Sequence, residues 1–164
     1  MRLLQSFPDT DLVALCDPFE ENRTKAGEEF AVAARYASTE EMFDAEALQA
    51  VIVATPAHLN AKAALPGIER GIHTLMEKPP GMQPDETRTL RSAAQKSGAR
   101  CMVGWNRRFD PYIQQALREI KSRGPVYQLI GEFHKGMSGF IASGRFPPEV
   151  MDNFLLETPI HSID

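Results

Sequence analysis

The sequence lacks the features that mark several classes of protein. It has two cysteines in 164 residues, and no apolar run approaches the roughly 18 residues of a membrane span. Lysine and arginine are scattered and the net charge is −4, so no basic patch for nucleic acid is indicated. The apolar part of the first residues is too short for a secretory signal. We therefore expect a cytoplasmic protein without membrane or nucleic-acid partners.

The two cysteines and the overall composition narrow the class further. Cys16 and Cys101 both lie in apolar, strand-like runs, which predicts buried free thiols and neither a disulfide nor a metal site. The composition, 43% apolar and 24% charged, is that of a globular domain with a core. The length suits one domain, or one domain and part of a second.

Short apolar runs alternate with helical patterns along most of the chain. This order predicts an α/β fold with a parallel sheet. Pro66 falls inside one predicted helix and should kink or shorten it. Strands are expected at 12–16, 32–36, 51–55, 72–76 and 99–104, and helices at 1–7, 20–30, 38–48, 59–70, 84–97 and 111–123.

The pattern changes at Gly124-Pro125, where we place a domain boundary between residues 1–123 and 124–164. Residues 126–133 alternate between apolar and polar, as in a half-exposed strand. Residues 135–148 are rich in Gly, Ser and Pro, which predicts a loop, and a helical pattern begins at Val150.

Two apolar runs end abruptly in polar residues and proline. The first, 51–58, ends in Thr55-Pro56-Ala57-His58, and the second runs from Met76 into Glu77-Lys78-Pro79-Pro80. Parallel strands that end in this way face the crevice in which α/β sheets bind ligands. A charged pair directly after a core strand is hard to explain by packing alone.

Five short motifs follow one another along the chain: 12–17 (LVALCD), 54–58 (ATPAH), 77–79 (EKP), 104–109 (GWNRRF) and 161–164 (HSID). Each motif alone is weak evidence. Together they resemble the Gfo/Idh/MocA family of NAD(P)-dependent oxidoreductases over nearly the whole chain. The resemblance implies a Rossmann-like, doubly wound parallel sheet in residues 1–123. Residues 124–164 would begin an α+β C-terminal domain for substrate and oligomer contacts.

The resemblance also implies a cofactor site. Asp17 would bind the adenosine ribose; for a lone Asp-Pro a turn before Pro18 would be the better explanation, and the resemblance reverses that preference. An acid there favours NAD, with NADP as the alternative. The segment with Thr55, Pro56 and His58 would follow the pyrophosphate and nicotinamide ribose. Further cofactor contacts are implied for Glu77, Lys78 and Asn106.

The catalytic residues implied are Lys78, His161 and Glu157. Lys78 would polarise the substrate hydroxyl and His161 would accept its proton. Relatives usually carry an Asp where this chain has Glu157 and a Gly where it has Pro159, and the proline could disturb the helix that joins Glu157 to His161. A cis peptide before Pro79 is also implied by the resemblance.

Glycine is absent from the 16 residues before Asp17. The family opens with a strand and a glycine-rich turn about 20 residues before this acid. That strand would lie between strands 12–16 and 51–55, and without it the two have no common neighbour. We therefore expect a fragment of a protein about twice as long, inactive as given and homo-oligomeric when complete.

The function expected is oxidation of a secondary hydroxyl of a sugar, cyclitol or related polyol. The first alternative is a catalytically dead relative that acts as a ligand-sensing or interaction module. The second is a reductase for an unrelated carbonyl substrate. The retained Lys78 and His161 argue for the enzyme, whereas the missing glycine turn and Pro159 argue for the dead relative.

Overall fold

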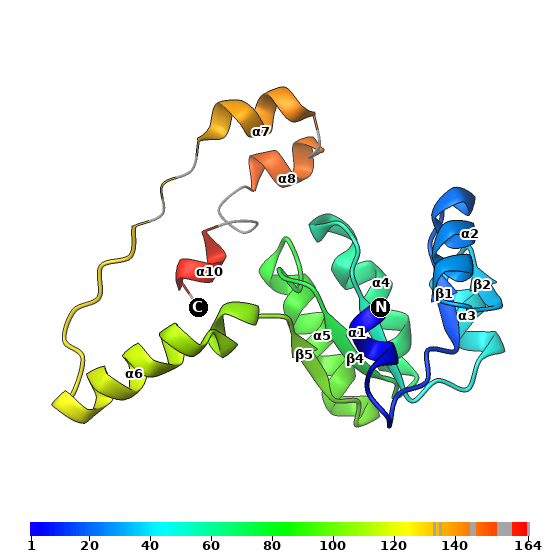
Figure 1. Cartoon of the computed structure of the whole chain (residues 1–164), viewed down its shortest axis with the longest axis horizontal. Coiled ribbons are helices and arrows are strands. Elements are labelled where there is room, and N and C mark those ends of the chain that lie inside the picture. The colour runs from blue at the N-terminus through cyan, green and yellow to red at the C-terminus, as the bar shows by residue number, and fades with distance from the viewer. Residues whose placement is uncertain (133, 135, 145–146, 154–158, 164) are drawn as a thin grey trace.

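A computed structural model describes residues 1–132, 134, 136–144, 147–153 and 159–163. Every strand pair in it is parallel, and helices connect the strands (Figure 1), as the α/β prediction requires. The strands form two separate sheets, β1-β2 and β3-β4-β5. Among the described residues, no helix is both long enough and apolar enough to cross a membrane.

The first sheet is small. It pairs β1 (Ala14–Cys16) with β2 (Ala34–Tyr36), and α2 (Glu20–Glu29) connects them. A single helical turn, α1 (Arg2–Gln5), lies against the end of α2 through an ion pair of 2.6 Å between Arg2 and Glu29. No residue of β1 or β2 is fully buried.

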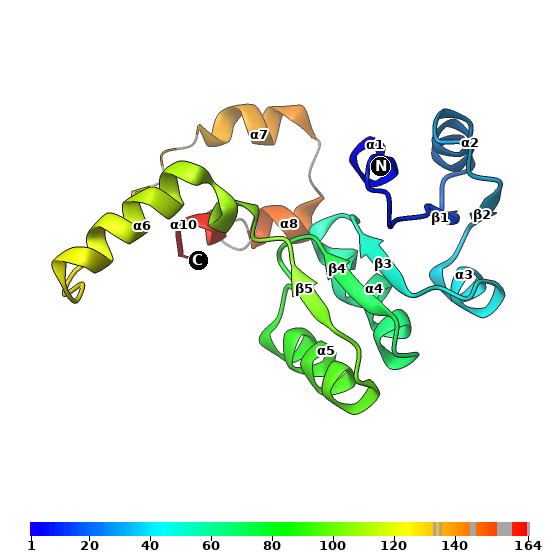
Figure 2. The ribbon, with the colours of Figure 1, turned by 60° about the horizontal axis from the view of Figure 1, so that its bottom comes forward.

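The second sheet carries most of the core. It contains β3 (Ala50–Val53), β4 (His73–Met76) and β5 (Cys101–Val103). Helices α4 (Asn60–Glu69) and α5 (Pro84–Ser97) lie together on one side of it (Figure 2). The buried cluster between sheet and helices consists of Val53, Ala64, Ile68, Met76, Leu90 and Ala99.

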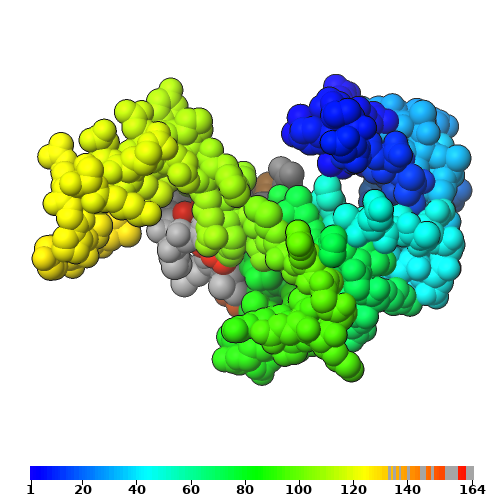
Figure 3. Space-filling view, turned by 90° about the horizontal axis from the view of Figure 1, so that it is seen from below, coloured from blue at the N-terminus to red at the C-terminus, as the bar shows by residue number. Residues whose placement is uncertain are grey.

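The opposite face of the second sheet is open. Ile52, Leu75 and Met102 lie in register across the three strands and are 38–50% exposed. In a doubly wound fold helices cover both faces of the sheet. The space-filling view shows a hollow between the N-terminal residues, in blue, and the green body of the molecule (Figure 3).

Side chains join the two sheets where backbone hydrogen bonds do not. Helix α3 (Thr39–Ala45) buries Met42 and Phe43 against Ile72, and Ala14 of β1 and Val51 of β3 pack on the same cluster. Among the described residues, β1 pairs only with β2, and β3 only with β4. This arrangement confirms that strands 12–16 and 51–55 have no common neighbour.

Local side-chain and glycine signals set several of the helix ends. The Ser38 hydroxyl accepts the Glu41 N–H at the start of α3, and the Asp110 carboxylate accepts the Tyr112 N–H at the start of α6 (Pro111–Arg123). Gly98, at φ +77°, ends α5 in the left-handed conformation that glycine adopts most readily. Helix α4 contains Pro66 and spans Asn60–Glu69, one residue shorter at each end than the predicted 59–70.

The C-terminal part corrects two predictions. Residues 126–132 form no strand, and the region predicted as a loop contains α7 (Met137–Ser143). A strand needs a hydrogen-bonded neighbour, and no described strand pairs with 126–132. Two short helices follow, α8 (Pro148–Asp152) and α10 (Ile160–Ile163). The division at residue 124 stays a prediction.

The cysteine prediction is half right. Both residues are free thiols, but Cys16 is only partly buried and Cys101 is exposed. Cys101 lies on β5, at the edge of its sheet, where one neighbouring strand is missing. Burial nevertheless raises the pKa of both thiols above the ordinary value of 9.0.

Candidate functional site

The carboxyl ends of the second sheet converge on one edge. The Glu77 N–H after β4 donates to the Val53 carbonyl of β3, and the Gly104 N–H after β5 donates to the Met76 carbonyl, each at 2.8 Å. The residues that follow the strands are therefore held side by side. They include the predicted residues Thr55, Glu77, Lys78 and Asn106.

The centre of this edge is a residue that the sequence did not single out. Asn60, the first residue of α4, is fully buried. Its Nδ2 donates to the Glu77 carbonyl at 3.0 Å and to the Pro79 carbonyl at 2.9 Å, while its Oδ1 accepts from Thr55 Oγ1 at 2.8 Å. A buried amide with all these partners satisfies the rule that buried polar groups are hydrogen-bonded.

Lys78 lies between the two carbonyls that Asn60 holds. Its peptide bond to Pro79 is cis, as the resemblance implied. Pro79 is buried and Lys78 half-buried, and Glu77 Oε2 accepts the Lys78 N–H at 3.2 Å. The structure thus holds the predicted pair Glu77 and Lys78 on one turn, and Asn60 links this turn to the predicted Thr55.

The far end of this turn is anchored separately. Glu86, in the first turn of α5, accepts the N–H groups of Met82 and Gln83 at 2.7 and 2.9 Å. A Cβ added at Gly81 would lie 2.7 Å from the Glu86 Cβ, so this glycine permits close packing. Residues 77–83 are therefore fixed at both ends.

Asp17 lies after β1, on the other sheet. Its Oδ1 accepts the Phe19 N–H at 2.8 Å, and the Asn22 amide reaches both carboxylate oxygens at 3.2 and 3.3 Å. These bonds are those of a turn that starts α2, the simpler explanation of an Asp-Pro pair. They leave carboxylate lone pairs available, so a ribose contact is compatible with the turn.

The segment from Thr55 to His58 leaves β3 and leads into α4 through a short 3-10 helix, η1 (Ala57–Leu59), with Pro56 at its N-cap. His58 is half-buried, and its Nδ1 is buried without a hydrogen-bond partner among the described residues. A buried polar atom of this kind is unusual in a folded protein. It marks this segment as one that a polar group can still occupy.

His161 reaches the site from the far end of the sequence. Its ring lies edge-on to the Trp105 ring, with centroids 6.3 Å apart, and the Arg108 guanidinium lies 6.0 Å from the Trp105 ring centroid. Trp105 follows β5 after Gly104 and precedes η2 (Asn106–Phe109), whose first residue is the predicted Asn106. Glu157 lies outside the described residues, so its predicted pairing with His161 stays a prediction.

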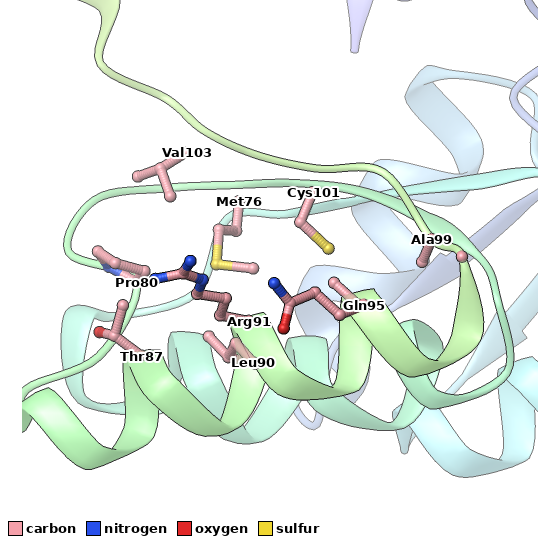
Figure 4. Close-up of a pocket in the computed structure, with 11 residues that line it drawn as sticks. Met76, Pro80, Thr87, Leu90, Arg91, Gln95, Ala99, Cys101 and Val103 are labelled. Carbon is pink, nitrogen blue, oxygen red and sulfur yellow. The ribbon is translucent and has the colours of Figure 1, made fainter.

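A cavity of about 490 Å³ lies elsewhere, between α5 and strands β4 and β5. The side chains of Cys101, Gln95 and Arg91 are directed into it, and Leu90 forms part of its floor (Figure 4). Of the residues predicted to bind cofactor or substrate and described here, none lines this cavity. The candidate site is therefore the edge at Lys78, where the charged and polar side chains lie, and not the cavity.

The residues at this edge, together with Asp17 on the other sheet, fit a nicotinamide dinucleotide. Asp17 offers acceptors to a ribose, and His58 Nδ1, which has no hydrogen-bond partner among the described residues, lies in the segment after β3. Glu77 and Lys78 follow β4, and Asn106 lies just beyond β5. Parallel strands with helical crossovers and a ligand edge at the carboxyl ends define a Rossmann-type α/β protein.

Comparison with known proteins agrees. The model of an oxidoreductase family described as having an NAD-binding Rossmann fold (GFO_IDH_MocA) matches residues 1–105, and the chain belongs to this family. The chain is 27% identical over 165 residues to scyllo-inositol 2-dehydrogenase (NAD(+)) of Bacillus subtilis (strain 168), covering 99% of this chain and 47% of the relative. It is 26% identical over 171 residues to scyllo-inositol 2-dehydrogenase (NADP(+)) of the same strain, covering 99% and 52%.

A solved structure supports the fold over the whole chain. The myo-inositol 2-dehydrogenase of Lactobacillus plantarum superposes with a TM-score of 0.82 at 22% identity, covering 98% of this chain and 49% of that one. The chain spans about half the length of the relatives that it matches. NAD(P) is thus the cofactor of the family, and both nucleotides occur among its relatives.

Proposed function

We propose that this chain is the dinucleotide-binding half of an NAD(P)-dependent dehydrogenase that oxidises a secondary hydroxyl of a cyclitol, sugar or related polyol. The observation that carries the proposal is the two-sided fixation of Lys78 at the edge where three strand ends meet. The inositol dehydrogenases among its relatives support the substrate class.

In this proposal each residue has a separate task. Lys78 donates a hydrogen bond to the substrate hydroxyl and stabilises the negative charge that grows on its oxygen. His161 takes the hydroxyl proton, and Glu157 supports the imidazolium that forms. When bound, the nicotinamide ring would supply the acceptor for the hydride that leaves the substrate carbon bearing this hydroxyl.

The cofactor proposed is NAD, because the Asp17 carboxylate would repel a 2′-phosphate. Thr55, Pro56, His58, Glu77 and Asn106 form the rest of the proposed cofactor wall. Two free thiols suit a reducing compartment, so we place the protein in the cytoplasm. The complete protein is proposed to be a homo-oligomer that uses its C-terminal domain.

The test uses the longest polypeptide encoded by the reading frame that contains residues 1–164, together with the 164-residue chain. Trp105 is the single tryptophan of residues 1–164, so in the 164-residue chain energy transfer from it to NADH reports binding, and in the longest polypeptide the same signal is read from all its tryptophans. Turnover is followed as NADH formation with myo-inositol, scyllo-inositol and simple sugars. Lys78→Ala should lower kcat by about 10²–10³-fold, in line with the loss of one charge-stabilising donor, while NADH binding persists.

Absence of energy transfer at millimolar NADH in the longest polypeptide would contradict the proposal. Turnover that Lys78→Ala leaves unchanged would contradict the role of this residue. A reductase for an unrelated carbonyl would form no NADH with these polyols and would consume NADH when a carbonyl substrate is supplied.

One observation favours a second candidate, a ligand-sensing or interaction module without catalysis. The edges of β1 and β3 that face away from their partners are unpaired among the described residues. A module of this kind would bind polyol without turnover. Binding of scyllo-inositol by calorimetry, with no NADH formed by the longest polypeptide, would favour it.

A further inference from the structure

We propose that Asn60 is the positioning residue for Lys78, and this inference rests on the proposed function. Asn60 does not touch the expected substrate position. Its two amide hydrogens go to the carbonyls immediately before and after Lys78, those of Glu77 and Pro79. The backbone on both sides of Lys78 is thereby tied to one buried point at the start of α4.

The hydrogen bonds also fix which way the amide points. Carbonyl oxygens can only accept, so both contacts with Glu77 and Pro79 require the nitrogen of the amide. The amide oxygen then faces Thr55 Oγ1 at 2.8 Å, and since this oxygen can only accept, the Thr55 hydroxyl must donate. A flipped amide would lose both bonds to the carbonyls, and the Thr55 hydroxyl would have to accept instead of donate.

This chain of bonds sets the chemistry of Thr55. A hydroxyl has one hydrogen, and here it is committed to Asn60. Thr55 can therefore meet a ligand only as an acceptor, which suits a ribose hydroxyl or a carboxamide N–H and not a phosphate oxygen. One buried side chain thus links the segment after β3, proposed for the cofactor, with the turn that carries the substrate-binding lysine.

Burial makes the link rigid. Asn60 and Pro79 are both less than 2% exposed, and Lys78 is half-buried on a backbone that Glu86 anchors at its far end. Hydrogen bonds shielded from water are costly to break because the freed groups stay buried. Loss of the Asn60 amide should therefore release the Lys78 backbone specifically.

Two variants test this, with a matched control. Asn60→Asp keeps the shape but sets a carboxylate against two carbonyl oxygens, and Thr55→Val removes only the bond that orients the amide. Thr74→Val is the control, because Thr74 is 3% exposed and its hydroxyl donates to the Ile72 carbonyl near the opposite end of β4. The control removes one buried hydrogen bond without touching the turn.

The first readout needs no activity. The 164-residue variants are pulsed with acetic anhydride, and the acylation rate of each lysine is measured by peptide mass spectrometry. We expect Lys78 acylation to rise about tenfold in Asn60→Asp, which loses two buried hydrogen bonds to the turn, and about threefold in Thr55→Val, which loses one. Lys25, Lys62 and Lys96 should keep their wild-type rates, and Thr74→Val should leave Lys78 unchanged.

The second readout is kinetic and uses the longest polypeptide. Asn60→Asp should lower kcat about tenfold and leave the Kd for NADH within about twofold, because the interaction lost acts on the reacting group. Equal changes of Lys78 acylation in Asn60→Asp and Thr74→Val would overturn the positioning role, with or without turnover. A rise in Lys78 acylation that is confined to Asn60→Asp and Thr55→Val, in a protein without turnover, would support the positioning role of Asn60 and refute the proposed enzyme.

Discussion

The two sheets of this molecule differ in how they are held together. In the β3-β4-β5 sheet, Val53 and Met76 are buried beneath α4 and α5, and Ile68 of α4 is completely inaccessible. In the β1-β2 sheet every strand residue keeps some exposure. The sheet with Lys78 therefore has a core of its own, whereas the sheet with Asp17 depends on α3 and its neighbours.

This difference matches the demands of the two proposed tasks. A group that stabilises a charge during reaction must be held in place, because small displacements are costly to the rate. Lys78 meets that demand through Asn60 and the buried strand beneath it. A ribose contact tolerates more freedom, and Asp17 stands on a turn held by its own loop.

The largest effect should come from the core of the second sheet. Ile68→Ala removes a fully buried side chain between α4 and the strands and should cost about 2–5 kcal/mol of unfolding free energy. Leu15→Ala, on half-exposed β1, should cost less than half as much, because less apolar area is lost. Urea denaturation followed by circular dichroism measures both. Equal losses would remove the distinction between the sheets.

The junction of the sheets should respond next. A Cβ at Gly67 would lie 2.9 Å from Cζ of Phe43, so Gly67→Ala should push α4 from α3 and cost about 1–3 kcal/mol. Gly139→Ala is the matched control, since Gly139 lies in α7 with no atom within 4 Å of the added Cβ. The control should be neutral or stabilising by up to about 1 kcal/mol. Thermal unfolding of both variants makes the comparison.

The strand ends, the helix caps and Asn60 show what could and could not be predicted from the sequence. Strand ends and helix caps were predictable because their signals are local, as with the apolar run that stops at Glu77 or the Asp110 cap. The burial of Asn60 was not, because its partners lie 17 and 19 residues away and an Asn at a helix start is ordinary. Only tertiary contact distinguishes it.

The errors have the same origin. Residues 126–132 have the alternation of a strand, but alternation describes a face and provides no hydrogen-bonded neighbour. Cys101 looked buried because its run is apolar, yet β5 is an edge. In both cases the missing information was what lies next to the segment. Helix α7 was missed because its glycine and serines favour turns.

The role of Asp17 should produce a smaller effect. Asp17→Asn removes the charge and should shift the ratio of NADPH to NADH affinity by about fivefold toward NADPH, as expected for a partly exposed charge. Quenching of tryptophan fluorescence by each nucleotide in the longest polypeptide measures the ratio. Asn22→Ala loosens the same carboxylate without changing its charge and should leave the ratio near its wild-type value. A variant Asp17→Asn that loses stability but keeps the ratio would reduce Asp17 to a turn residue.

The smallest effect should appear at alkaline pH and should be larger in the first sheet, which holds Tyr36 and Cys16, than in the second, which holds Cys101. The Tyr36 hydroxyl donates to Glu46 Oε1 at 2.6 Å, which raises the Tyr36 pKa above its ordinary value of 10.0, and burial raises the pKa of Cys16. Because these pKa values are higher in the folded than in the unfolded state, the groups contribute fully to the free energy of unfolding below their ordinary pKa. This contribution is lost as pH rises through the raised pKa. Urea midpoints should therefore hold from neutral pH to about 9 and then fall, and Tyr36→Phe should remove part of the fall. Because Tyr36 and Cys16 both belong to the first sheet and Cys101 lies on the edge strand β5 of the second, hydrogen exchange should show this loss in β1 and β2 before the central strand β4. Simultaneous loss in all strands would mean that the two sheets unfold as one unit.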